Sequence, residues 1–111
     1  MSVDLDESQL LALAGDDRGF LVSVVEEFRE NSLQLVEQMG QACVREDWEG
    51  FKKLVHQLKG TSGSLGMVSL HALAVRLEEM AREGGVAEVC VEELRDLLDL
   101  SVQLAFSCLE G

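Results

Sequence analysis

Apolar residues recur along the chain at spacings of three and four positions, which is the period of amphipathic α-helices. This periodicity predicts a short helix over about residues 6–14, with Asp4 or Asp6 as its N-cap and Gly15 as its end. Longer helices are predicted at about residues 17–45, 48–65, 67–83 and 87–109. The links between them are short, so consecutive helices are expected to be antiparallel neighbours.

The fold predicted by this pattern is all-α: an antiparallel up-down-up-down four-helix bundle, with the short first helix covering one end. The 111 residues are enough for a single core, and we expect one domain over residues 1–111. The absence of proline favours long uninterrupted helices.

Asn31 and Ser32 interrupt the inner side of the second helix and are unexplained by the pattern. The apolar stripe of that helix is expected to comprise Phe20, Leu21, Val24, Val25, Phe28, Leu35, Val36, Met39 and Cys43.

Charge and composition then limit the classes of function that the sequence allows. With 21 acidic and 9 basic residues the formal net charge is −12, which argues against nucleic acid as a partner. No secretory signal is visible, and no apolar run approaches the roughly 20 residues of a membrane span. The cysteines Cys43, Cys90 and Cys108 show no metal-binding or disulfide spacing, so they are interpreted as reduced thiols. We expect a cytoplasmic protein that does not act on membranes.

The third predicted helix carries the features that indicate function. A helical wheel puts His56 roughly 150° from the centre of the apolar face, on the side exposed to water. All three lysines, Lys52, Lys53 and Lys59, lie on this helix, and no Asp or Glu occurs from residue 51 to residue 77. An acidic protein therefore presents a small positive patch around one histidine, which suits an anion or an acidic partner surface.

Two glycines follow His56 on the same side of the helix. Gly60 and Gly63 occupy positions i+4 and i+7, where side chains would otherwise stand beside the imidazole. Each costs about 1 kcal/mol of helix stability relative to alanine, and clearing space for a large partner is one reason to accept that cost. The alternative is that the helix ends at Lys59 and that the glycines belong to a loop.

Other chemistries fit the sequence less well. The segment from residue 60 to residue 66 has glycines but lacks the pattern of a phosphate-binding loop. His56 and His71 have no further ligands at metal-binding spacing, so no metal site is expected, and His71 is interpreted as a flanking or half-buried residue. A hydrolase using Ser62 or Ser64 would lack a nearby acid. The adjacent carboxylates of Glu78 and Glu79 are interpreted as solvated helix surface.

The stretch from Val55 to Gly66 resembles the motif of histidine-containing phosphotransfer (HPt) domains. That motif has a histidine, then lysine and glycine three and four residues later, and a second glycine ten residues after the histidine. His56, Lys59, Gly60 and Gly66 match these positions, although Val55 stands where the family most often has alanine. The likeness covers most of the chain and continues through Leu70, Leu77 and Glu78 downstream, and through Phe20 and Phe28 upstream.

The resemblance implies a phosphoryl carrier in a multistep two-component relay. A receiver-domain aspartyl phosphate, as in a hybrid sensor histidine kinase, would phosphorylate His56, by analogy on Nε2, and His56 would pass the group to another response-regulator receiver. Lys59 would stabilise the phosphoryl charge, Gly60 and Gly63 would give the partner access, Gly66 would be structural, and Lys52 and Lys53 would help docking.

A family member of this kind is expected to be a monomer without an ATP site or cofactor, and Mg²⁺ would belong to the receiver. Two other functions stay open. One is a binding module that sequesters a receiver without accepting phosphoryl, and the other is a phosphatase partner that drains one.

Overall fold

The computed structural model describes residues 3–110, and these residues form helices at all five predicted places. The helices are α1 (Glu7–Ala14), α2 (Arg18–Val44), α3 (Trp48–Ser64), α4 (Val68–Glu83) and α5 (Glu88–Glu110). Every boundary lies close to the one predicted from the sequence. Because α3 continues as far as Ser64, the alternative in which it ends at Lys59 is excluded.

Aspartates at the N-caps explain where three of the helices begin. Asp6, Asp17 and Asp47 precede α1, α2 and α3, and each carboxylate accepts a hydrogen bond from the backbone N–H three residues further on. Such a cap contributes about 1 kcal/mol by satisfying a donor that has no partner inside the helix. Gly15 ends α1 with a φ of 56°, a left-handed value that glycine adopts without strain.

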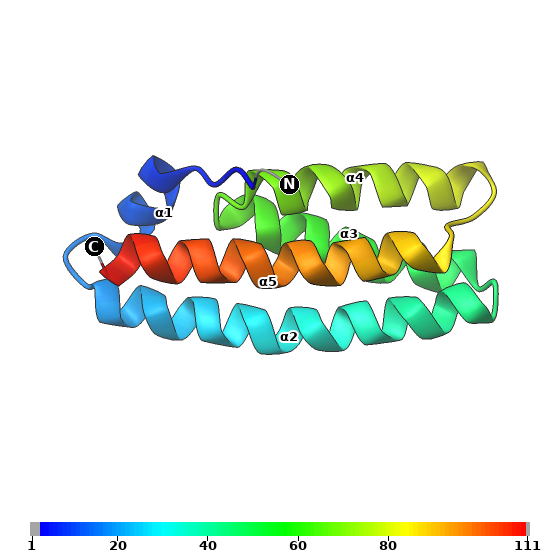
Figure 1. The fold of residues 1–111 in the computed structure, drawn as a ribbon, viewed down its shortest axis with the longest axis horizontal. Helices are drawn as coiled ribbons and strands as arrows, with labels where there is room; N and C mark the ends of the chain where they lie inside the picture. The colour runs from blue at the N-terminus through cyan, green and yellow to red at the C-terminus, as the bar shows by residue number, and fades with distance from the viewer. Residues whose placement is uncertain (1–2, 111) are drawn as a thin grey trace.

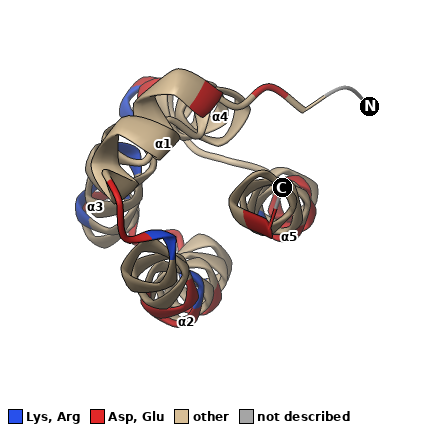
Figure 2. Ribbon diagram, turned by 90° about the vertical axis from the view of Figure 1, so that its left-hand side faces the viewer, with Lys and Arg blue, Asp and Glu red and all other residues tan. Residues whose placement is uncertain are grey.

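The four long helices form a ring in chain order. Each packs against the next, and α5 closes the ring against α2 (Figures 1 and 2). Successive helices run in opposite directions, while α1 lies across one end and contacts α2 and α5. The predicted up-down-up-down bundle with a short N-terminal helix over one end is therefore confirmed. No helix in residues 3–110 combines the length and the apolar character needed to cross a membrane.

The apolar stripe of α2 is narrower than predicted. One row of α2 residues is buried in the core: Leu21, Val25, Phe28, Ser32, Val36, Met39, Ala42 and Cys43. Val24 and Leu35 are only half-buried, and the prediction that Phe20 is a core residue is wrong, since it is 61% exposed. Asn31 is also exposed, which removes the apparent polar interruption at that position. Val24, Asn31 and Leu35 lie on the side of α2 that borders α3, at the edge of the core.

The turn between α3 and α4 is fixed by the start of the chain. The N–H of Asp6 donates to the Gly66 carbonyl at 2.7 Å, and the Gln9 amide donates to the carbonyls of Gly63 and Ser64. Gly66 has a φ of 72°, and a Cβ there would lie 2.9 Å from the Asp6 carbonyl oxygen. Glycine is thus required both by the backbone conformation and by the close approach of the N-terminal segment.

Candidate functional site

His56 lies near the middle of α3 and points away from the core. Val55 and Leu58, its neighbours on the inner side of the helix, are fully buried. By contrast, 69% of the His56 side chain is exposed. The structure therefore orients the imidazole as the helical periodicity predicted, and a macromolecule can reach it from solvent.

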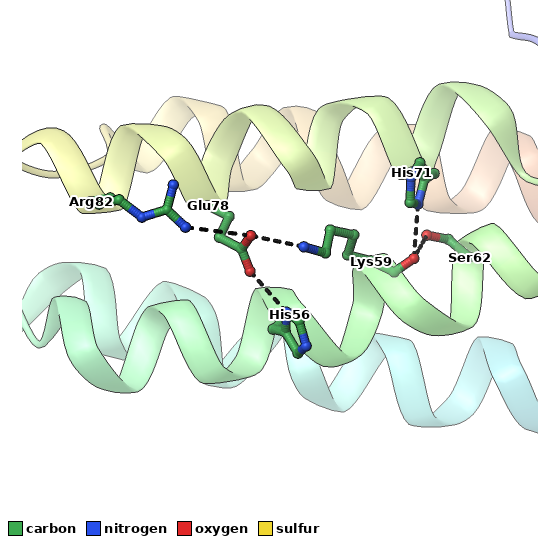
Figure 3. A network of polar contacts seen from close by, with 6 residues as sticks. All are labelled: His56, Lys59, Ser62, His71, Glu78 and Arg82. Carbon is green, nitrogen blue, oxygen red and sulfur yellow. Dashed lines mark hydrogen bonds and ion pairs between the residues drawn. The ribbon is translucent and has the colours of Figure 1, made fainter.

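A carboxylate on the neighbouring helix contacts this imidazole. Glu78 of α4 accepts a hydrogen bond from His56 Nδ1 at 3.1 Å through Oε2, and one from Lys59 Nζ at 2.9 Å through Oε1 (Figure 3). The guanidinium of Arg82 lies 3.8 Å from the same Oε1 atom. Glu78 is only 13% exposed, so its charge is compensated by groups that surround it rather than by water.

This arrangement favours the ionised form of Glu78 and thereby sets which ring nitrogen of His56 carries the shared hydrogen. Hydrogen bonding to Lys59, supported by the hydrogen bond to His56, holds the pKa of Glu78 below its ordinary value although partial burial acts in the opposite direction. An ionised carboxylate only accepts hydrogen bonds, so the shared hydrogen belongs to His56 Nδ1. In the neutral imidazole, Nε2 then carries the lone pair.

Gly60 lies beside the imidazole and leaves the space next to it open. A Cβ built at Gly60 would have no atom within 4 Å apart from its own helix and chain neighbours. Gly60 and His56 also border an open groove of about 800 Å³ between α2 and α3. Its lining combines apolar and uncharged polar side chains: Val24, Phe28, Asn31, Ser32, Gln34, Leu35, Gln38, Gln57, Thr61, Ser64 and Leu65, with Glu27 as an added charge.

Gly63 does not open the space beside His56, and this part of the sequence interpretation is corrected. A Cβ at Gly63 would lie 3.0 Å from Nδ1 and 3.3 Å from Cε1 of His71, a residue of α4. The glycine therefore accommodates the packing of α3 against α4. His71 is half-buried, as expected, and its Nδ1 lies 2.9 Å from the Lys59 carbonyl oxygen.

The remaining predicted residues do not line the groove beside His56. Lys52 forms an ion pair with Glu49 at 2.7 Å, Lys53 is exposed, and neither lines the groove. Gly66 belongs to the turn after α3 and is buried there. The structure thus brings together His56, Lys59 and Gly60, and places the other predicted residues outside this group.

Glu78 is the residue of the site whose role the sequence interpretation missed. It was grouped with Glu79 as solvated surface, but only Glu79 is exposed. The available signal was the Leu77–Glu78 pair, which matches the family pattern noted above. Arg82, one turn further along α4, had no comparable signal.

Comparisons with known proteins identify the family. A family model described as Hpt domain matches residues 23–104. The fold is similar to the crystal structure of histidine-containing phosphotransfer protein B (HptB) from Pseudomonas aeruginosa PAO1, with a TM-score of 0.84 and 21% sequence identity. The alignment covers 96% of this chain and 94% of that one. A search of curated proteins found no significant sequence match. Because the Hpt domain model covers most of its length, the chain belongs to the Hpt family of histidine-containing phosphotransfer domains.

Proposed function

We propose that His56 is the phosphoryl acceptor of this phosphotransfer protein. It takes the group from an aspartyl phosphate of a response-regulator receiver domain, such as that of a hybrid sensor histidine kinase, and gives it to the aspartate of another receiver. The observation that carries the proposal is the His56–Glu78 hydrogen bond. This bond places the imidazole hydrogen on Nδ1 and leaves an exposed Nε2 as the nucleophile.

The reaction needs no separate base. The Nε2 lone pair attacks phosphorus, the N–P bond forms, and the P–O bond to the receiver aspartate breaks, so that the carboxylate leaves with its electron pair. The hydrogen on Nδ1 stays where it is. Because the ring becomes positively charged, the adjacent Glu78 carboxylate stabilises the product and the transition state that leads to it.

The ammonium of Lys59 is suited to donating hydrogen bonds to the phosphoryl oxygens. Its ammonium has three donors, and the structure engages Nζ with Glu78 through one hydrogen bond. The others can bind phosphoryl oxygens on His56, which lies one turn away on the same side of α3. Lys59 thus acts on the charge of the transferred group, as is general for phosphoryl transfer.

The receiver binds over the α2–α3 groove in this proposal. Gly60 leaves open space beside His56, and the groove lining combines apolar with polar side chains, as protein interfaces do. The Mg²⁺ of the reaction belongs to the receiver, and exposed Lys53 can assist the approach of its acidic pocket. We propose that the carrier acts as a monomer.

We also infer that the whole chain, residues 1–111, is one domain. Leu10 of α1 and Leu109 of α5 belong to the same buried cluster as the residues of α2, α3 and α4.

The protein draws its phosphoryl group from a receiver and not from ATP. We place the exchange in the cytoplasm, since the three cysteines are free thiols, which is typical of proteins in a reducing compartment.

Transfer of radiolabelled phosphoryl tests the proposal. A phosphorylated receiver is mixed with the wild-type protein or with His56→Gln, and label on the protein is followed in acid and in alkali. We expect label on the wild type that is stable in alkali and lost in acid, and none on the variant. The variant should keep its unfolding free energy to within about 0.5 kcal/mol because the side chain is exposed.

Other results of this experiment would support other functions. Binding of a receiver without label on either protein would indicate a sequestering module. Rapid release of inorganic phosphate without accumulation on His56 would indicate a phosphatase partner.

A further inference from the structure

Lys59 is held by α4 at both of its ends. Its ammonium donates to Glu78 at 2.9 Å, and its backbone carbonyl oxygen lies 2.9 Å from Nδ1 of His71 (Figure 3). His71 and Glu78 are seven positions apart, so two turns of α4 place them on the same face of that helix. One face of α4 therefore contacts both the side chain and the main chain of Lys59.

The direction of the second hydrogen bond follows from its acceptor. A carbonyl oxygen has no hydrogen to donate, so His71 Nδ1 is the donor. The hydroxyl of Ser62 also lies near this oxygen, at 3.2 Å, but it lies 2.6 Å from the Leu58 carbonyl and has a single hydrogen to give. His71 is thus the donor from α4 that fixes the Lys59 carbonyl.

The position of the His71 ring depends on Gly63. A Cβ at Gly63 would lie 3.0 Å from the same Nδ1 atom, closer than ordinary van der Waals contact. A methyl group there would push the ring away from the Lys59 carbonyl or push α4 away from α3. The glycine and the histidine therefore form a matched pair on adjacent helices.

We propose that His71, packed over Gly63, is a positioning residue of the phosphotransfer site. By holding the Lys59 backbone to α4, it sets the register in which Lys59 and His56 meet Glu78. This inference rests on the proposed function of His56. A shift of α3 along α4 would lengthen both hydrogen bonds to Glu78. A misplacement of about 1 Å at a reacting group can slow a reaction by about a hundredfold.

Four variants separate a positioning role from a general effect on stability. His71→Leu keeps the bulk but removes the donor, whereas His71→Asn puts an amide N–H near the place of Nδ1. Gly63→Ala displaces the ring without altering it. Gly40→Ala is the matched control: it makes the same change in α2, where a Cβ would meet Val91 at an ordinary 3.9 Å.

The rate of His56 phosphorylation by phosphoramidate is the readout, because this small donor does not depend on receiver docking. We expect His71→Leu and Gly63→Ala to be slower by about tenfold, with His71→Asn and Gly40→Ala within about twofold of wild type. In ¹H–¹⁵N spectra the first two variants should also shift the Nδ1 signal of His56, while the other two leave it in place.

Three outcomes would overturn the inference. Wild-type rates in His71→Leu and Gly63→Ala would show that the contact does not position the site. Equal losses in His71→Leu and His71→Asn, scaling with unfolding free energy, would reduce His71 to a packing residue. If neither phosphoramidate nor a phosphorylated receiver labels the wild-type protein, the proposed function itself fails and the inference with it. The first two outcomes, in which the wild-type protein is labelled, remove the inference alone.

Discussion

The Glu78 carboxylate of α4 accepts a hydrogen bond from His56 Nδ1 of α3, although the two residues are 22 positions apart in the sequence. Carboxylates paired with imidazoles in this way fix the tautomer and the orientation of the ring. Glu78 is also hydrogen-bonded to Lys59, so the two groups proposed to act in phosphoryl transfer share one partner. The packing of α4 against α3 therefore determines the hydrogen-bond partner of an exposed histidine.

Replacing this carboxylate tests its role directly. Glu78→Gln keeps the size of the side chain and an oxygen that can accept from Nδ1, but removes the charge that offsets the phosphorylated ring. We expect phosphorylation of His56 by phosphoramidate to slow by about tenfold to a hundredfold, the range for loss of a partner that orients a functional imidazole through its other nitrogen. Glu79→Gln, an exposed neighbour on the same helix, is the control. Equal rates in the two variants would contradict the assignment.

The Glu78 interactions also predict a dependence of stability on pH. The pKa of Glu78 is lowered in the folded protein from an ordinary value of 4.5, so its ionised form favours folding. This contribution is complete above pH 4.5 and is lost as the pH falls through the folded-state pKa. The difference in unfolding free energy between wild type and Glu78→Gln should therefore shrink on acidification. Urea unfolding over this range measures it, and a pH-independent difference would argue against the ion pair.

Periodicity and capping were sufficient to predict the fold. Aspartates mark the starts of α1, α2 and α3, and glycines mark the ends of α1 and α4, because these residues have local roles that do not depend on tertiary structure. The width of the α2 stripe was less predictable. Asn31 and Leu35 lie on the side of α2 facing α3, and how far such residues are covered depends on how closely the two helices pack.

The site was predictable only as far as it lies on one helix. His56, Lys59 and Gly60 share α3, so their relative placement follows from the helical repeat. Glu78 belongs to α4, and helix periodicity alone does not reveal which of two adjacent carboxylates turns toward a neighbouring helix. Gly63 was misassigned for the same reason, since the ring that occupies the space next to it comes from His71 across the helix boundary.

Gly66 provides a test of the turn that follows the site. Alanine there would have to adopt a φ of 72° with its Cβ 2.9 Å from the Asp6 carbonyl oxygen. We expect Gly66→Ala to lower the unfolding free energy by about 1 to 3 kcal/mol. Faster hydrogen exchange of the Asp6 amide should accompany this loss because its acceptor is the Gly66 carbonyl. Gly40→Ala, in an ordinary helical position, is the control, and equal effects of the two substitutions would refute the argument.

A substitution at Gly60 is expected to change access to His56 without lowering the stability of the bundle. A Cβ at this exposed helical position meets nothing within 4 Å, and leucine is a better helix former than glycine. Gly60→Leu should therefore leave unfolding free energy unchanged or raise it by up to about 1 kcal/mol. Its side chain would nevertheless stand beside the imidazole, at the border of the α2–α3 groove.

The two phosphoryl donors should then respond differently to Gly60→Leu. Transfer from a receiver requires a protein surface to approach Nε2, so it should fall by at least about tenfold, the effect of a small misplacement of reacting groups. Phosphoramidate is small enough to pass the leucine, so its reaction should change much less. Equal slowing with both donors would mean that leucine disturbs His56 itself, and unchanged transfer from the receiver would show that Gly60 does not serve to admit the partner.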